Sequence, residues 1–291
     1  MNTTTHRTLA VLLLACLTAL PFSVREQMPA WVFMWALAFA LYFGCKVLTL
    51  ADAGPALATN HGVRTLGYLL LWPGMDPKPF AQTARDLITP NLKAWVHALF
   101  GTLHGAILVW VIVPLIDEAY WLLRAIVGML GIIWLLHFGL FHLLALAWQT
   151  RRIAVRPLMD KPTRATSLTE FWGRRWNSGF HDLMHRYIFR PAMRRFSVRT
   201  AMLLVFLASG LIHELVITVP AGGGYGLPTL YFLLQGLGVE LERSTLGRDW
   251  RLGEGVKGWC FVFIVTAGPV ALLFPPPFLH HVILPMLKTI T

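Results

Sequence analysis

A histidine and a glutamate stand side by side in one of the most apolar stretches of the chain, LLVFLASGLIHELVITVP, as His213 and Glu214. Ionisable side chains are costly inside a membrane unless they face a cavity or a partner, so such a pair predicts a functional site by default. A neutral imidazole can take a proton from a hydroxyl group and so activate it as a nucleophile. We therefore predict that His213 is a general base. A structural contact between helices is the alternative.

A second stretch that could do chemistry precedes the histidine by some thirty residues. It reads SLTEFWGRRWNSGFHDLMHR and runs from Ser167 to Arg186. Asn177 lies within it, and an amide placed near a general base could orient the reacting groups or stabilise the oxyanion of an acyl-transfer transition state. An asparagine in this position also suits a helix cap, so both interpretations stay open from the sequence.

The same stretch carries an edge of cationic and aromatic side chains, formed by Trp172, Arg174, Arg175 and Trp176. Guanidinium groups match the geometry of phosphate oxygens, which predicts a binding site for the phosphates of an acyl carrier such as coenzyme A. The alternative is contact with lipid headgroups while the side-chain stems lie along apolar surface.

Helix signals indicate how these residues are positioned. Ser167 can cap a helix, and Glu170 three residues later completes a capping box. From that start, Trp172 and Trp176 are four residues apart and are expected to share one helix face. The surrounding segment, 148–199, combines about a dozen arginines and lysines with aromatic residues. This composition predicts amphipathic helices in the membrane interface.

Other polar residues lie in or beside apolar stretches. Gln235 and Glu240 occur in the apolar run that follows His213, and we predict that Gln235 and Glu214 line a substrate cavity. The glycine-rich loop Ala221–Pro228 has no GK[ST] ending and no preceding strand, so it is interpreted as a tight turn and not as a phosphate loop.

Composition defines the class of protein. The chain has 291 residues, of which 56% are hydrophobic and 13% charged, and its mean hydropathy is +0.60. These values predict an integral membrane protein, and apolar runs without strand alternation predict an all-α fold. The net charge of +11 arises from basic residues in short loops. It therefore points to membrane lipids and anionic ligands as partners, and not to nucleic acid.

The apolar runs predict a single membrane-embedded domain, 1–291, with about eight transmembrane helices. The expected spans are 8–24, 30–50, 94–116, 119–147, 199–219, 227–242, 257–274 and 278–290. The prolines and glycine that break the segment 65–80 favour a half-inserted or surface hairpin there. The first run resembles a signal peptide but lacks a cleavage site, so we expect a retained span.

Orientation follows from the basic residues in the loops. The N-terminus and the loops 52–93, 148–199 and 243–257 carry most of the lysines and arginines, and they alternate with loops poor in both. This pattern predicts that both termini are cytoplasmic. Three isolated cysteines at apolar positions, Cys16, Cys45 and Cys260, are expected to be unpaired thiols.

Two other classes of function deserve comparison. The spacings of His137 with His142 and of His181 with His185 would suit metal ligands on helices, as in membrane di-iron oxidoreductases. That interpretation needs further paired boxes, and only His280–His281 offers adjacent histidines. A non-enzymatic lipid transporter is the third possibility, because polar residues at membrane depth could bind cargo without chemistry.

Several of these stretches together resemble one known family. The run SLTEFWGRRWN, the pair Arg190–Pro191 and the span SGLIHELVITVP are similar to the wax synthase branch of the membrane-bound O-acyltransferases. The segments LLWPGMDPKPF and GGGYGLPTLYFLLQGLGVELER are similar to bacterial members of that branch. The likeness extends from about Leu69 to Arg243.

This resemblance implies helices around an intramembrane tunnel that acyl-CoA enters from the cytoplasm and a lipophilic alcohol enters from the lipid. It assigns His213 as catalytic base and Asn177 as a second active-site residue, and it implies a bacterial inner-membrane enzyme that forms wax-type esters. We expect no metal or other cofactor, because the thioester of acyl-CoA is already activated. The acceptor alcohol, the acyl length and the oligomeric state stay open.

Overall fold

The computed structural model describes residues 3–53, 62–84 and 89–291, and within these ranges it contains helices and no strand. The all-α prediction is therefore confirmed. The chain divides into two compact units, one formed by Met1–Leu158 with Ile283–Thr291 and the other by Met159–Val282. The organisation as one functional domain stays a prediction.

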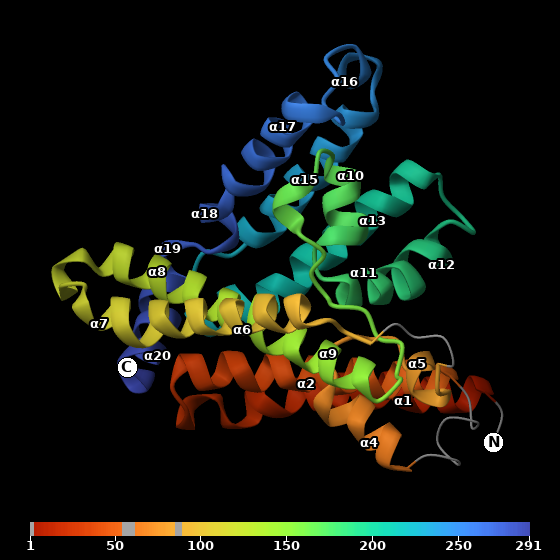
Figure 1. Ribbon diagram of the computed structural model, residues 1–291, viewed down its shortest axis with the longest axis horizontal. Coiled ribbons are helices and arrows are strands. Elements are labelled where there is room, and N and C mark those ends of the chain that lie inside the picture. Colours follow the sequence, from red (N-terminus) through yellow and green to blue (C-terminus); the bar gives the residue numbers. More distant parts are fainter. Residues whose placement is uncertain (1–2, 54–61, 85–88) are drawn as a thin grey trace. The chain divides into compact units, whose positions relative to one another are not determined.

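The first unit contains several long helices (Figure 1), and two of these contain a π-helical stretch. Its α-helices are α1 (Thr3–Ala19), α2 (Ala30–Ala53), α4 (Gly62–Leu71), α5 (Lys78–Ala81), α6 (Leu92–Ile107), α7 (Val113–Leu115), α8 (Trp121–Ile133), α9 (Phe141–Thr150) and α20 (Leu284–Ile290). Two π-helical stretches, Leu108–Ile112 and Trp134–Leu140, continue α6 into α7 and α8 into α9. Helices α1 and α2 pack side by side, and α6 packs against the Trp134–Leu140 stretch.

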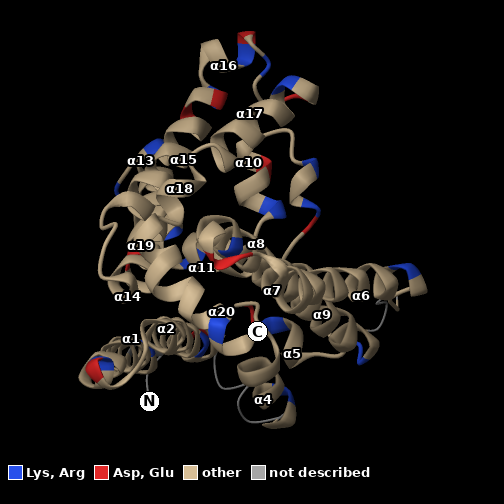
Figure 2. Cartoon of the chain, turned by 90° about the vertical axis from the view of Figure 1, so that its left-hand side faces the viewer, with Lys and Arg blue, Asp and Glu red and all other residues tan. Residues whose placement is uncertain are grey.

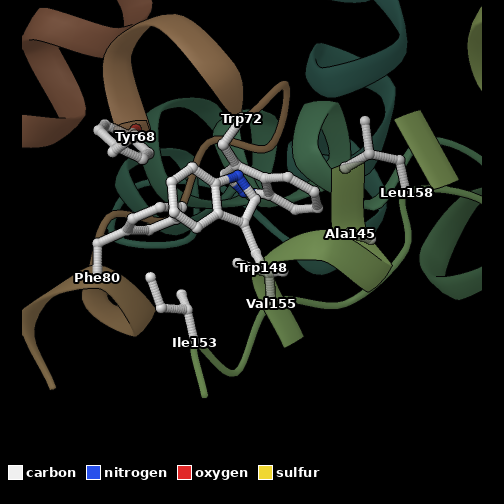
Figure 3. Packing of buried hydrophobic residues seen from close by; sticks show 8 residues of the cluster. All are labelled: Tyr68, Trp72, Phe80, Ala145, Trp148, Ile153, Val155 and Leu158. Atoms are coloured by element: carbon white, nitrogen blue, oxygen red, sulfur yellow. The ribbon is translucent and has the colours of Figure 1, made fainter. Parts of the chain in front are cut away.

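An aromatic cluster joins α4, α5 and α9 within this unit (Figure 3). The Trp148 ring lies 5.1 Å from that of Phe80, and its Nε1 donates to the Leu71 carbonyl at 3.0 Å. Trp72, in the broken segment after α4, is 4% exposed. The segment 65–80 is therefore a short helix and turn packed on α9. It is too short to span a membrane, as expected.

The second unit carries all the predicted site residues. Its α-helices are α10 (Leu168–Glu170), α11 (Ser178–Met184), α12 (Arg190–Ala192), α13 (Val198–His213), α14 (Val219–Ala221), α15 (Leu227–Arg243), α16 (Thr245–Asp249), α17 (Gly255–Ala267), α18 (Val270–Leu273) and α19 (Pro276–Phe278). π-Helical turns follow three of them, at Phe171–Arg175, His185–Phe189 and Glu214–Thr218. A fourth π-helical turn, Leu279–Ile283, follows α19.

Helices α13 and α15 form the centre of the second unit. They approach closely at Gly210, where an added Cβ would lie 2.6 Å from the Cα of Thr229. At the other end of α15, Gly238 faces the Leu168 side chain of α10, which would lie 2.7 Å from an added Cβ. The apolar residues between these two contacts include Phe206 and Phe232 and are buried. Helix α15 therefore touches both α13 and the start of the aromatic and basic stretch.

Six of the eight predicted spans are helices long and apolar enough to cross a membrane. They are Thr5–Gln27, Ala30–Ala53, Leu92–Leu115, Glu118–Thr150, Val198–Ala221 and Gly255–Leu273. Charged residues gather at helix ends and in connections, while the helices are uncharged along most of their length (Figure 2). At the other two positions, α15 has 17 residues and 276–290 is divided among α19, a π-helical turn and α20. The count of eight therefore stays a prediction, as does the orientation, and residues 54–61 and 85–88 of the 52–93 loop lie outside the described ranges.

Candidate active site

His213 is the last α-helical residue of α13 and is half-buried. Its Nδ1 lies 2.7 Å from the carbonyl oxygen of Ser209, one turn earlier. Because a carbonyl only accepts hydrogen bonds, this contact assigns the proton to Nδ1 and leaves the Nε2 lone pair as the basic site. The ring of Phe232 lies 4.4 Å away and that of Phe180 6.1 Å away. The imidazole is thus held in one tautomer among aromatic rings.

Glu214 turns away from this imidazole. Its Oε1 accepts from the N–H and the hydroxyl of Thr229, both at 3.0 Å, and its Oε2 accepts from the Thr218 hydroxyl at 2.5 Å. Thr229 lies in the first turn of α15, whose N-cap, Gly226, has no side chain to offer. The carboxylate therefore caps α15, as an acidic group suits a helix N-terminus. A substrate contact by Glu214 stays a prediction.

The aromatic and basic stretch begins as expected but differs in detail. The Ser167 hydroxyl caps α10 by accepting from the Glu170 N–H at 3.0 Å. The returning bond goes from the Thr166 N–H to the Glu170 carboxylate at 3.2 Å, one residue earlier than a capping box places it. The expected cap is therefore confirmed, and the reciprocal bond falls on Thr166.

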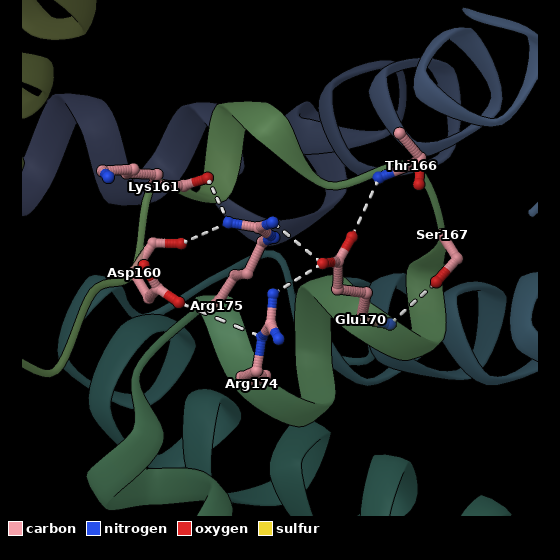
Figure 4. A network of polar contacts seen from close by, with 7 residues as sticks. All are labelled: Asp160, Lys161, Thr166, Ser167, Glu170, Arg174 and Arg175. Atoms are coloured by element: carbon pink, nitrogen blue, oxygen red, sulfur yellow. Dashed lines mark hydrogen bonds and ion pairs between the residues drawn. The ribbon is translucent and has the colours of Figure 1, made fainter. Parts of the chain in front are cut away.

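The Glu170 carboxylate also forms ion pairs with Arg174 and Arg175 (Figure 4). Arg174 and Arg175 each reach its Oε1 at 2.8 Å. Partial burial favours a higher pKa for Glu170, but the hydrogen bonds from Arg175 and from the Thr166 N–H, with both guanidinium charges, hold that pKa below its ordinary value. The carboxylate therefore stays charged and fixes the two arginines.

The guanidinium groups of Arg174 and Arg175 differ in their exposure and in their hydrogen-bond partners. The Arg175 side chain is 13% exposed, and its Nη1 donates to the carbonyls of Asp160 and Lys161 at 2.9 and 3.3 Å. The Arg174 side chain is 64% exposed and has a second acidic neighbour, Asp160, at 3.9 Å. Arg175 ties its own stretch to the segment before it, whereas Arg174 presents a guanidinium to the surroundings.

The expected shared face of Trp172 and Trp176 is wrong. The helix ends at Arg175, and Trp176 is extended, with its ring stacked on Phe171 at 5.6 Å. Trp172 instead packs into the apolar centre, 5.7 Å from the Phe232 ring. The π-helical turn and the helix end change the angular spacing that an α-helix would give.

Asn177 explains why the helix stops there. Its φ of 43° is left-handed, a conformation that asparagine tolerates better than most residues. Its Oδ1 caps α11 by accepting from the Phe180 N–H at 3.2 Å. This cap leaves the amide nitrogen Nδ2 for other partners. Phe180 links the two predicted catalytic residues, because its N–H bonds Asn177 and its ring contacts His213.

Three buried polar atoms of the same unit have no hydrogen-bond partner among the described residues: Nε1 of Trp172, Nε of Arg175 and Oε1 of Gln235. Gln235 is fully buried and uses its Nε2 on the Val265 carbonyl at 2.8 Å. Buried polar atoms without a partner are costly, so they are candidates for contacts with a bound ligand. The predicted substrate contacts of Trp172, Trp176 and Gln235 remain predictions.

Other features lie elsewhere. The rings of His181 and His185 stack nearly parallel at 5.9 Å, while His142 packs edge-on against His97 and His137 against Phe141. In the ranges 3–53, 62–84 and 89–291, no group of three or more His, Cys, Asp or Glu residues could hold a metal ion. The di-iron hypothesis therefore has no observation in its favour. A groove of about 560 Å³ lies along α16 and α17, lined by Asp249, Trp250, Leu252, Val256, Lys257, Cys260, Phe261 and Ile264, and it includes no predicted site residue. The predicted tunnel stays a prediction.

Sequence reasoning missed the residues that hold the site together. Phe180 and Phe232 flank His213, and Thr229 and Glu242 complete the polar contacts of α15. Glu242 was visible as an acidic residue at the end of an apolar run. Its partner was not, because the two are 74 residues apart.

Fold and site together define a polytopic α-helical membrane protein with a single-tautomer histidine beside an asparagine-capped motif. Residues 155–234, which include both Asn177 and His213, match the sequence model of the Membrane bound O-acyl transferase family. The match confirms the resemblance to membrane-bound O-acyltransferases predicted from the motifs, while the bacterial type stays a prediction. The matched region contains α10 to α14 and the first half of α15.

Individual relatives point to the same branch. A long-chain-alcohol O-fatty-acyltransferase from Simmondsia chinensis is 31% identical over 150 residues, covering 47% of this chain and 42% of the relative. The probable long-chain-alcohol O-fatty-acyltransferase 3 from Arabidopsis thaliana is 35% identical over 160 residues, covering 44% and 45%. The acyl-CoA–sterol O-acyltransferase 1 from Arabidopsis thaliana is 26% identical, covering 42% and 39%. The chain thus spans less than half the length of these relatives in each match.

Proposed function

We propose that this protein is an acyl-CoA-dependent O-acyltransferase that transfers a fatty acyl group to the hydroxyl of a lipophilic alcohol and forms a wax-type ester. The observation that carries the proposal is the hydrogen bond from His213 Nδ1 to the Ser209 carbonyl, because it leaves Nε2 as a base inside a predicted span. The printed names of the relatives support long-chain alcohols or sterols as the acceptor class.

The reaction then proceeds by direct attack. Nε2 of His213 takes the proton from the acceptor hydroxyl as its oxygen bonds to the thioester carbonyl carbon. The C–S bond breaks when the tetrahedral intermediate collapses, and the proton passes from the imidazolium to the leaving thiolate of coenzyme A. A general base typically contributes about 10²–10⁴ in rate. An oxyanion donor adds a comparable factor, and the Asn177 Nδ2 is the amide donor that fits this role.

The charged edge of the stretch suits the acyl carrier. Arg174 combines a guanidinium with an exposure of 64%, which fits contact with coenzyme A phosphates. The engaged Arg175 contributes by fixing the stretch. A thioester needs no further activation, so the mechanism requires no metal. We also propose that the protein lies in a bacterial inner membrane with both termini in the cytoplasm, where coenzyme A is available.

The test is alcohol-dependent release of coenzyme A thiol. Purified protein in lipid nanodiscs receives a long-chain acyl-CoA with and without hexadecanol, and the ester is identified by mass spectrometry. We expect thiol and ester in equal amounts, with release lost in a His213→Ala variant that retains the wild-type melting temperature. Thiol release without ester, or wild-type rates in His213→Ala, would refute the proposal. A lipid transporter would give no thiol in either condition.

A further inference from the structure

Glu242 lies one residue before the end of α15 and is 8% exposed. Its Oε2 accepts from the Leu168 N–H at 2.5 Å, and its Oε1 accepts from the Thr169 hydroxyl at 2.7 Å and the Thr169 N–H at 3.3 Å. All of these donors belong to the first turn of α10, at the start of the aromatic and basic stretch. A buried carboxylate is thus stabilised by neutral donors of a helix N-terminus, which favours negative charge.

The backbone N–H donors at the start of α10 therefore all have hydrogen-bond partners from Leu168 to Glu170. Glu242 takes the N–H groups of Leu168 and Thr169, while Ser167 takes that of Glu170. Free N–H groups at a helix start must otherwise find water or side chains. Because Glu242 of α15 accepts from the Leu168 N–H, 74 positions earlier in the chain, these hydrogen bonds fix the position of α10 relative to α15.

The opposite end of α15 is tied in the same way. Glu214, the neighbour of His213, accepts from Thr229 in the first turn of α15. Thr229 and Glu242 are 13 residues apart on α15, so the helix connects two carboxylate contacts separated by about 20 Å. Between them, Phe232 contacts both the His213 ring at 4.4 Å and the Trp172 ring at 5.7 Å.

We infer that Glu242 is a positioning residue for the proposed acyl transfer: it fixes the aromatic and basic stretch against α15 so that Asn177 is held in register with His213. The inference rests on the proposed function. It extends that function by naming the link between its two catalytic elements. Glu242 itself touches no substrate. It acts through α10 and the stretch that ends at Asn177.

Glutamine at this position tests the inference most sharply. Glu242→Gln keeps the side-chain length and one acceptor oxygen, but its amide group would face an N–H donor of α10 and repel it. The matched control is Glu240→Gln, on the same helix two residues away, whose carboxylate pairs with the 71% exposed Arg199. The Glu240 side chain is itself 18% exposed, but its partner Arg199 lies largely in the surroundings, where an ion pair contributes little, so the control should behave as wild type.

Steady-state kinetics separate positioning from general instability. A displacement of about 1 Å at a reacting group can cost on the order of 10²-fold in rate. We expect kcat of Glu242→Gln to fall by that order, with the KM for acyl-CoA within about twofold. Glu242→Asp, which keeps the charge, should recover part of the loss. Glu240→Gln should match wild type in both quantities.

Hydrogen exchange gives a readout independent of activity. In Glu242→Gln the amides of Leu168 and Thr169 should exchange faster, while those in the middle of α13 keep their protection. Wild-type kcat, or unchanged exchange at Leu168 and Thr169, would overturn the inference even if the enzyme is active. Failure of the proposed function is distinguishable, because the wild-type protein itself would then release no coenzyme A with alcohol.

Discussion

Each of the two units places a basic side chain within an apolar helix, and the two side chains are held in different ways. In the first unit, Lys46 of α2 is fully buried, donates to the carbonyls of Tyr68 at 3.0 Å and of Gly74, and lies 3.6 Å from the Tyr68 ring centre. In the second, His213 uses one nitrogen on Ser209 and keeps the other. The Lys46 ammonium donates to backbone carbonyls, whereas His213 keeps the lone pair of Nε2 for a substrate proton.

This difference teaches how to treat ionisable residues inside a membrane protein. Burial alone marks both residues as functional candidates. Hydrogen-bond capacity separates them, because the Lys46 ammonium binds two backbone carbonyls and the face of the Tyr68 ring, whereas His213 binds the backbone through Nδ1 and keeps Nε2. Exposure divides the two arginines instead, because both pair with Glu170, but the Arg174 side chain is 64% exposed and that of Arg175 is 13% exposed. Hydrogen-bond capacity also divides the two ends of the Asn177 amide, of which Oδ1 serves as a cap.

After the loss of His213 itself, the largest effect should come from removing the Nδ2 donor of Asn177 while its capping oxygen is kept. Asn177→Asp keeps an oxygen to cap α11 and tolerates the left-handed backbone, but it loses the Nδ2 donor. We expect kcat to fall by about 10²–10³, the loss seen when an oxyanion donor is removed. The melting temperature should stay within a few degrees of wild type. An active Asn177→Asp variant would show that this residue only caps α11.

Lys46→Met should instead affect stability. The substitution removes the Lys46 hydrogen bonds to the carbonyls of Tyr68 and Gly74, at about 1–3 kcal/mol for each buried bond lost. Thermal unfolding in detergent should show a lowered midpoint. Specific activity per folded molecule should equal that of wild type. A selective loss of activity without a change in midpoint would place Lys46 in the chemistry and break the comparison.

Arginine substitutions should give a smaller, divided effect. Arg174→Ala is expected to raise the KM for acyl-CoA several-fold while the melting temperature holds. Arg175→Ala is expected to lower the melting temperature with little direct effect on KM, since its guanidinium binds the Asp160 and Lys161 carbonyls. Arg175→Lys, which lacks the planar fork, should resemble Arg175→Ala in stability. If both alanine variants raise the KM for acyl-CoA equally, the distinction between an exposed, carrier-binding Arg174 and a structural Arg175 is incorrect.

The smallest effect should appear on acidification. The pKa of Glu170 is lower in the folded protein than in the unfolded chain, so its contribution to stability is complete above the ordinary glutamate pKa of about 4.3 and is lost as pH falls below it. Glu170→Gln should remove this component. We therefore expect the melting temperatures of variant and wild type to converge as pH falls through 4. A constant difference between pH 7 and pH 3 would contradict it.

The sequence predicted what depends on local pattern. Apolar length gave six spans that the structure contains, and the Ser167 cap followed from adjacent residues. The shared face of Trp172 and Trp176 failed because a π-helical turn and the left-handed Asn177 end the helix. The contact of Glu242 with α10 depends on packing between residues 74 positions apart, which no local spacing contains. Lys46 looks as functional as His213 until its partners are known.

The most direct test compares His213→Gln and Lys46→Met in one assay. Thiol release per folded molecule is measured with acyl-CoA and hexadecanol in nanodiscs, after folded protein is quantified by size-exclusion chromatography. His213→Gln keeps a polar side chain of similar reach but has no basic nitrogen, so its rate should fall by about 10²–10⁴. Lys46→Met should retain the wild-type rate. Equal rates in the two variants would contradict the assignment of His213 as the base.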